Sequence, residues 1–205
     1  MEAPARSIRP DLRLIADMIE PRSRVLDVGC GAGELLHYLV YDKNVDGRGI
    51  ELSSEGVNAC VSAGLSVIQG DAETDLFDYP EAAFDYVVLG QTLQAMLAPK
   101  TILEQMLRIG RRAVVSLPNF AHWRHRLYLL SAGRMPVSAT LPYEWYETPN
   151  LHLCTIKDFV VMCETMNIAI ERRICLDPRG VPHRFGRGLL FANLLGAEAV
   201  FLLRR

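Results

Sequence analysis

The chain is poor in cysteine and carries almost no excess charge. Its five cysteines are odd in number and widely spaced, with no CxxC pair and no zinc-ligand spacing. This pattern excludes a disulfide scaffold, argues against a metal site and favours a reducing, cytoplasmic compartment. The formal net charge of −2 provides no general attraction for polyanions, so nucleic acid is not expected as a partner.

Long hydrophobic runs are also missing. The most apolar stretch, residues 189–203, is interrupted by Asn193, Gly196 and Glu198 and is shorter than the roughly 20 residues of a membrane span. The N-terminal residues contain acids and lack the apolar segment of a signal peptide. We therefore expect no membrane segment, and a length of 205 residues predicts a single domain over 1–205.

Short apolar, β-branched runs alternate with amphipathic segments from Arg24 to Ile109, a pattern typical of βα units around a parallel sheet. The last two predicted strands are joined by a Gly- and Arg-rich stretch over 177–188 instead of a long helix, so we expect an antiparallel final pair. The predicted fold is α/β, with seven mostly parallel strands and the last one reversed. Strands are expected at 24–28, 48–52, 65–69, 84–89, 113–117, 169–175 and 199–203, helices at 8–19, 33–41, 53–63, 100–109 and 155–166, and an insertion at 119–150.

Three alternate glycines follow the first predicted strand. The run Val-Leu-Asp-Val-Gly-Cys-Gly-Ala-Gly-Glu, residues 25–34, places Gly29, Gly31 and Gly33 between that strand and a helix. Glycines allow a sharp turn there and let a ligand approach the backbone. The GxGxG spacing differs from the GxGxxG of dinucleotide-binding proteins, and Asp27 just before it favours a cationic ligand over a pyrophosphate.

Two more acids follow the next two strands. Glu51 ends the second strand, where a carboxylate can accept both hydroxyls of a ribose, and Asp71 follows the third, where an open α/β sheet contacts the base of a nucleoside. A glycine triplet alone is as often an empty turn as a binding loop. With two acids on the same sheet edge, a ligand site becomes the better interpretation.

The motifs LDVGCGAG (26–33), GIEL (49–52), GDAE (70–73) and FDYVVL (84–89) resemble those of class I S-adenosylmethionine-dependent methyltransferases, which have a Rossmann-like fold. The resemblance implies S-adenosylmethionine or S-adenosylhomocysteine as the ligand. It places the glycine loop at the amino-acid part, Glu51 at the ribose, Asp71 at the adenine and Gln91 beside the sulfonium. The cofactor-binding residues it implies are Asp27, Gly29, Cys30, Gly31, Gly33, Glu51, Leu52, Asp71, Ala72, Gly90 and Gln91.

The sequence departs from that pattern after the fourth strand, where many small-molecule methyltransferases carry a histidine and this chain has Ala95. Methyl transfer from a sulfonium rests largely on in-line positioning, so a missing base does not exclude catalysis. The weak candidates for a catalytic base are His122 and Tyr143, both in the insertion.

The second half of the chain carries irregular blocks: SLPNFAHW (116–123), GRMP (133–136), PYEWYETPN (142–150) and HLCT (152–155). These resemble the methionine-biosynthesis family MetW. The resemblance implies a methyltransferase-like protein whose partner is homoserine O-acyltransferase. Three functions stay open: an accessory or regulatory partner that binds the cofactor, a methyltransferase acting on a small molecule, or a protein that has kept the fold and lost the cofactor.

Aromatic residues and arginines gather in the insertion. This composition is common at interface hot spots and also suits a lid over a ligand. For any single aromatic, packing onto the sheet is the more frequent role, so we expect most of them to be buried. The aromatic residues concerned are Trp123, Tyr143, Trp145 and Tyr146.

Overall fold

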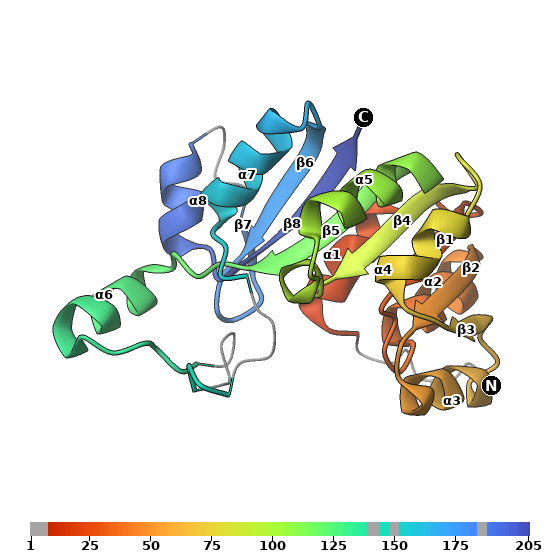
Figure 1. Ribbon diagram of the computed structural model, residues 1–205, viewed down its shortest axis with the longest axis horizontal. Coiled ribbons are helices and arrows are strands. Elements are labelled where there is room, and N and C mark those ends of the chain that lie inside the picture. Colours follow the sequence, from red (N-terminus) through yellow and green to blue (C-terminus); the bar gives the residue numbers. More distant parts are fainter. Residues whose placement is uncertain (1–7, 139–143, 148–151, 184–187) are drawn as a thin grey trace.

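The computed structural model describes residues 8–138, 144–147, 152–183 and 188–205. In this part of the chain one sheet of eight strands has the order β3-β2-β1-β4-β5-β8-β6-β7 (Figure 1). Its strands are β1 (Arg24–Val28), β2 (Asp46–Glu51), β3 (Val67–Gln69), β4 (Phe84–Gly90), β5 (Gly110–Pro118), β6 (Ala169–Leu176), β7 (Pro182–His183) and β8 (Glu198–Arg204).

Strands β1 to β5 are parallel, and β8 runs antiparallel to both of its neighbours, β5 and β6. The predicted Rossmann-like fold with a reversed last strand is therefore confirmed. The count of seven strands was wrong, because Pro182–His183 pairs with Cys175 and Leu176 as a short edge strand. Its surroundings are rich in proline and glycine, and two residues cannot produce a strand period.

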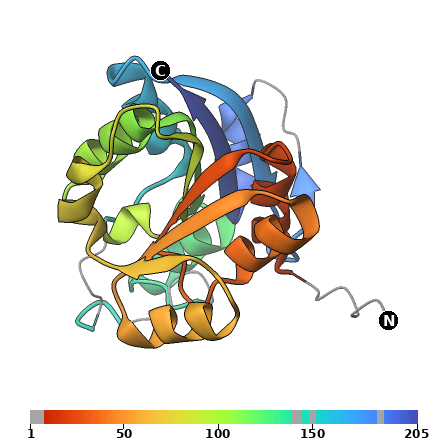
Figure 2. The ribbon, with the colours of Figure 1, turned by 90° about the vertical axis from the view of Figure 1, so that its right-hand side faces the viewer.

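Helices cover both faces of the sheet (Figure 2). The helices α4, α5, α7 and α8 lie against the larger apolar cluster, and α1 and α2 against a second one on the other face. The helices are α1 (Pro10–Met18), α2 (Glu34–Lys43), α3 (Ser54–Ser62), α4 (Ala72–Asp75), α5 (Pro99–Ile109), α6 (Trp123–Ala132), α7 (Ile156–Thr165) and α8 (Leu189–Leu195), with 3₁₀ turns η1 (Leu76–Asp78) and η2 (Leu93–Ala95).

The five predicted helices are present with shifts of a few residues at their ends, and two have the predicted caps. The Ser53 hydroxyl accepts from the backbone N–H of Gly56 at the start of α3, and Thr155 forms a capping box with Asp158 at the start of α7. The connection after β6 differs from the expectation, because it contains α8. The apolar residues of α8 continue toward those of β8, so the sequence shows no helical period there.

Side chains of the central strands alternate between the two faces. On β4, Val87 and Leu89 pack into the larger cluster, while Tyr86 and Val88 pack under α1 and α2. All four are at most 2% exposed. Burial on both faces holds the strands rigidly, so the loops at their carboxyl ends start from fixed positions. In the described part of the chain, no helix combines the length and apolar character needed to cross a bilayer.

Candidate functional site at the carboxyl edge of the sheet

The glycine loop leaves the carboxyl end of β1 and turns into α2. The N–H of Gly29 donates to the carbonyl of Ile50 at 2.8 Å, which ties the loop to β2. The φ angles of Gly29, Gly31 and Gly33 are +67°, +55° and +78°. A Cβ on Gly31 would meet no atom within 4 Å, whereas one on Gly33 would lie 2.5 Å from a methyl group of Leu65. The loop is thus closely packed at Gly33 and open to a ligand at Gly31.

The carboxylate of Glu51 holds this loop from the end of β2. It accepts the backbone N–H of Gly31 at 2.8 Å and that of Ser53 at 2.9 Å. Burial by itself would raise the pKa of Glu51, but the hydrogen bonds from Ser53 and Gly31 outweigh it and lower the pKa. Glu51 therefore stays ionised. A Cβ on Gly56 would lie 2.8 Å from Cγ of Glu51, so α3 packs closely behind the carboxylate.

Asp27 lies beneath the loop and is 4% exposed. Among the described residues, no group donates a hydrogen bond to its carboxylate. Burial raises the pKa of Asp27 to about 7, and the negative charge of Glu51 adds to the effect. A cation beside this carboxyl would restore its ionised form, so the site favours a positively charged ligand.

Cys30 lies in the loop with its Sγ 4.0 Å from that of Cys60. Burial raises the pKa of the Cys30 thiol, and the charge of Asp27 adds to this, so the thiol stays protonated. Its side chain packs against the small cluster of Leu36, Cys60 and Leu65, as a small apolar group would.

The residues expected at an adenine lie at the start of α4, and Leu52 follows Glu51. One oxygen of Asp71 accepts the N–H of Glu73 at 2.9 Å and caps α4. Ala72 is half-buried against the main core, and Leu52 is 67% exposed. These side chains share the edge of the sheet with Asp27 and Glu51, since each lies at or just after the carboxyl end of a parallel strand.

Gly90 and Gln91 close the other side of the edge, at the end of β4. The backbone N–H of Gln91 donates to the carbonyl and hydroxyl oxygens of Ser116 on β5, each at 3.0 Å. Its side-chain Nε2 donates to Asp11 at 3.2 Å and to Glu198 at 3.0 Å. Sequence reasoning did not find these two acids, because no motif or periodicity links positions so far apart.

His122 caps α6, and its Nδ1 accepts the N–H of Arg124 at 3.4 Å. It is 4% exposed, and burial, followed by the nearby His125 and Arg124, lowers its pKa. His122 is therefore neutral near pH 7, as a base must be. Tyr143, the other catalytic candidate, lies outside the described residues.

The aromatic residues of the insertion that the structure describes face solvent. Trp123 is 41% exposed, Trp145 71% and Tyr146 66%. The expectation that single aromatics pack onto the sheet is wrong for these three. Composition alone predicts large apolar groups but does not specify which face they take, and here the sheet is already covered by α7 and α8.

Comparisons with known proteins agree with this fold. The family model described as "Methionine biosynthesis protein MetW" matches residues 9–203. A curated relative from Rhodopirellula baltica, named bifunctional methionine biosynthesis protein MetXA/MetW, is 32% identical over 180 residues, or 83% of this chain. The chain spans only 29% of that relative's length.

Solved structures with the same fold have diverse names. A SAM-dependent methyltransferase from Archaeoglobus fulgidus matches with a TM-score of 0.66 and 16% identity, covering 95% of this chain and 91% of its own. The [4+2]-cyclase SpnF also has a TM-score of 0.66, at 20% identity, covering 95% of this chain and 80% of its own. At such identities the likeness shows the fold alone.

Proposed function

Because the chain belongs to the MetW family of methionine biosynthesis proteins, we propose that it is a cytoplasmic accessory protein that binds S-adenosylmethionine or S-adenosylhomocysteine and regulates a homoserine O-acyltransferase. The observation that supports the partner role is the fused relative. Its name joins a MetXA and a MetW unit in one chain, and we take the MetXA unit to be the acyltransferase. A covalent link keeps two units at high effective concentration, as a functional pair requires.

The edge residues fit the proposed cofactor. Asp27 is a buried carboxyl with no hydrogen-bond donor among the described residues, and it would pair with the cationic amino-acid end. Glu51 is ionised and would accept ribose hydroxyls, and Asp71 and Ala72 would border the adenine. When bound, S-adenosylmethionine supplies a methyl group activated by a sulfonium. The open face of Gly31 leaves room for such a ligand against the backbone.

Exposed apolar groups on α6 and the following segment support a protein partner. Leu127 is 54% exposed and Leu130 85%, and Trp145 and Tyr146 also face solvent. Helix α6 projects from the body of the molecule beside α8 (Figure 1). Exposed apolar groups of this kind, with tryptophan and tyrosine among them, are typical of interfaces.

The cofactor edge is joined to α6 through β5. Ser116 on β5 accepts the hydrogen bonds of Gln91, and three residues later Asn119 fixes the start of the insertion. The Asn119 side chain donates to the carbonyls of Asn193 at 2.9 Å and Gly196 at 2.7 Å. Since S-adenosylmethionine is made from methionine, its binding at this edge would report the end product to the partner.

The rate of homoserine acylation by the acyltransferase from the same cell tests the proposal, with and without a stoichiometric amount of this protein. We expect a changed rate and co-elution of the two proteins, and a response to S-adenosylmethionine that Glu51→Ala removes. Glu104→Ala, an exposed acid on α5, is the matched control. An unchanged rate without a complex would refute the partner role. A response that survives in Glu51→Ala after binding is lost would refute the regulatory role of the cofactor.

The second candidate is methyl transfer to a small molecule, favoured by the neutral His122 in the wall of a cavity that also contains Glu198, a hydrogen-bond partner of Gln91. Release of S-adenosylhomocysteine from S-adenosylmethionine in fractionated metabolite pools would support it. Absence of release across broad pools, with the cofactor bound, would exclude this reaction for the metabolites present.

A further inference from the structure

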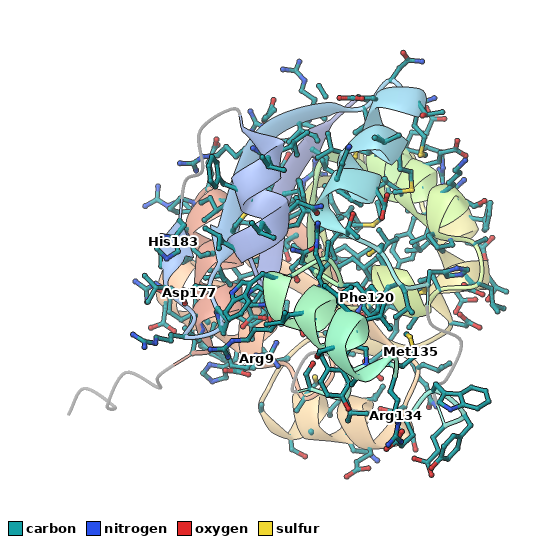
Figure 3. All side chains as sticks on the ribbon, turned by 90° about the vertical axis from the view of Figure 1, so that its left-hand side faces the viewer. Arg9, Phe120, Arg134, Met135, Asp177 and His183 are labelled. Carbon is teal, nitrogen blue, oxygen red and sulfur yellow. The ribbon has the colours of Figure 1, made fainter. Side chains whose placement is uncertain are left out.

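A cavity of about 450 Å³ lies beside the proposed cofactor edge. Its walls are the first turn of α1, the first turns of α6, the segment after α6, the loop after β6 and the start of β8. Figure 3 looks onto α6 at this face, with Arg9 and Asp177 on one side of the helix and Arg134 and Met135 on the other. The volume is in the range of sites for small ligands.

Two acids from opposite ends of the chain meet in this cavity. Asp11 is 5% exposed, and its carboxylate is matched by the guanidinium of Arg9 at 2.9 Å. Glu198 has no such partner: among the described residues it forms no ion pair, and its one hydrogen bond comes from the neutral amide of Gln91. Burial raises the pKa of Glu198, as does the charge of Asp11, while Arg9 and Gln91 act in the opposite direction. Arg124 also lines the cavity but forms no ion pair with Asp11 or Glu198, so among the described residues Arg9 is the one cation paired with either of these two carboxylates.

The lining of the cavity also presents a hydrogen-bond donor. The side chain of His122 is more than nine-tenths buried and lines the cavity. Its Nδ1 accepts from the backbone, so in the neutral ring the proton is on Nε2. No described residue pairs with Nε2. The cavity lining therefore combines two carboxylates with a ring nitrogen that forms no hydrogen bond with the described residues and that a ligand in the cavity can accept from.

We propose that this cavity binds a small molecule carrying a protonated primary amine, with the ammonium at Glu198 and Asp11 and an oxygen acceptor of the ligand at Nε2 of His122. The donor set argues for an amine over a metal ion, because no three His, Cys, Asp or Glu side chains converge in the described part of the chain. An ammonium supplies the missing positive charge and three donors. The inference goes beyond the proposed function and requires neither methyl transfer nor the acyltransferase.

Isothermal titration of the intact protein tests this with three amines, n-butylamine, L-homoserine and L-methionine, each compared with its uncharged N-acetyl derivative. We expect at least one amine to bind about tenfold or more tightly than its derivative, since acetylation removes a charge-assisted contact. Glu198→Gln should weaken that binding by a similar factor, and Glu104→Gln, at an exposed position of α5, should not change it. Equal binding of amine and derivative, unchanged binding by Glu198→Gln, or no binding of any amine would overturn the proposal.

Two further measurements locate the ligand. S-Adenosylmethionine binding to Glu198→Gln should equal that of the parent protein, which shows that the variant is folded and that the two sites are separate. Loss of both ligands together would assign the amine to the cofactor site and overturn the proposal. His122→Asn keeps a good helix cap but lacks Nε2. It should weaken binding of an amino acid and leave n-butylamine, which has no oxygen acceptor, unaffected; the reverse pattern would refute the orientation.

Discussion

Replacing Asp27 by asparagine is expected to stabilise the ligand-free protein at pH 8, although the change removes a proposed cofactor contact. Burial, with the charge of Glu51, raises the pKa of Asp27 from 3.8 to about 7. A tenfold change in proton affinity corresponds to about 1.4 kcal/mol, so the ionised carboxylate destabilises the fold by on the order of 4 kcal/mol at pH 8. An unpaired buried amide costs about 1–2 kcal/mol, which leaves a net gain of about 2 kcal/mol.

The sign of the pH dependence identifies the cause. Asp27 takes up a proton in the folded state below its pKa of about 7, whereas the unfolded chain stays ionised down to the ordinary value of 3.8. The penalty is therefore complete above pH 7 and declines as the pH falls toward 4. The advantage of the asparagine variant should shrink by on the order of 3 kcal/mol between pH 8 and pH 5. Urea unfolding of the parent protein and the variant at pH 8 and at pH 5 measures this difference in the free energy of unfolding.

Glu51→Gln is the matched control, because the negative charge of Glu51, unlike that of Asp27, is expected to stabilise the fold. Its carboxylate accepts two backbone N–H groups, and a glutamine would turn an amide toward one of them. This variant should lose about 1 kcal/mol at pH 8. The opposite signs of the two neutral substitutions are the expected result. Destabilisation by Asp27→Asn of equal size at pH 8 and pH 5 would refute the reasoning from buried charge.

Three other predictions concern the ligand, the loop and the partner. S-Adenosylmethionine is expected to bind the ionised form of Asp27, whose pKa is about 7. The dissociation constant of S-adenosylmethionine should therefore fall by up to about tenfold per pH unit from pH 5 to 7 and then level off. A dissociation constant that calorimetry finds independent of pH would contradict this. Gly33→Ala should cost about 2 kcal/mol or more in chemical denaturation, and Gly31→Ala only about 1, because a Cβ meets packed side chains at Gly33 and open space at Gly31. Leu130→Ser combined with Trp145→Ser should weaken co-elution with the acyltransferase at an unchanged melting temperature, since both side chains are exposed; unchanged co-elution would move the interface elsewhere.

The positions of the residues proposed to bind the cofactor could be predicted from the sequence, because each of them follows a local rule. Asp27, Glu51 and Asp71 each end or follow a short apolar run, and the carboxyl ends of parallel strands meet at one edge. Strand and helix positions followed from hydrophobic periodicity in the same way. Predicting these features requires only the order of elements along the chain, and the predicted strands and helices agree with the observed ones within a few residues.

The second cavity could not be predicted in this manner. It depends on Asp11, Gln91 and Glu198, whose meeting is set by the packing of α1 and β8 around the end of β4. Gln91 also has a φ of +52°, in the left-handed region, and this conformation cannot be predicted from the sequence for a residue other than glycine. The exposed face of α6 could not be predicted either. The mixed aromatic and basic composition of this helix gives no amphipathic period, so the sequence does not indicate which face is buried.

The position of β8 between β5 and β6 has a consequence for how the chain folds during synthesis. Strand β6 is made before β8, yet its long pairing is with β8, which separates it from β5. Until β8 is available, β5 has an open edge, and β6 has no partner among the described strands beyond the two residues of β7. Unpaired edges invite association with other chains. The growing protein is thus vulnerable to aggregation in the interval before β8 inserts between β5 and β6.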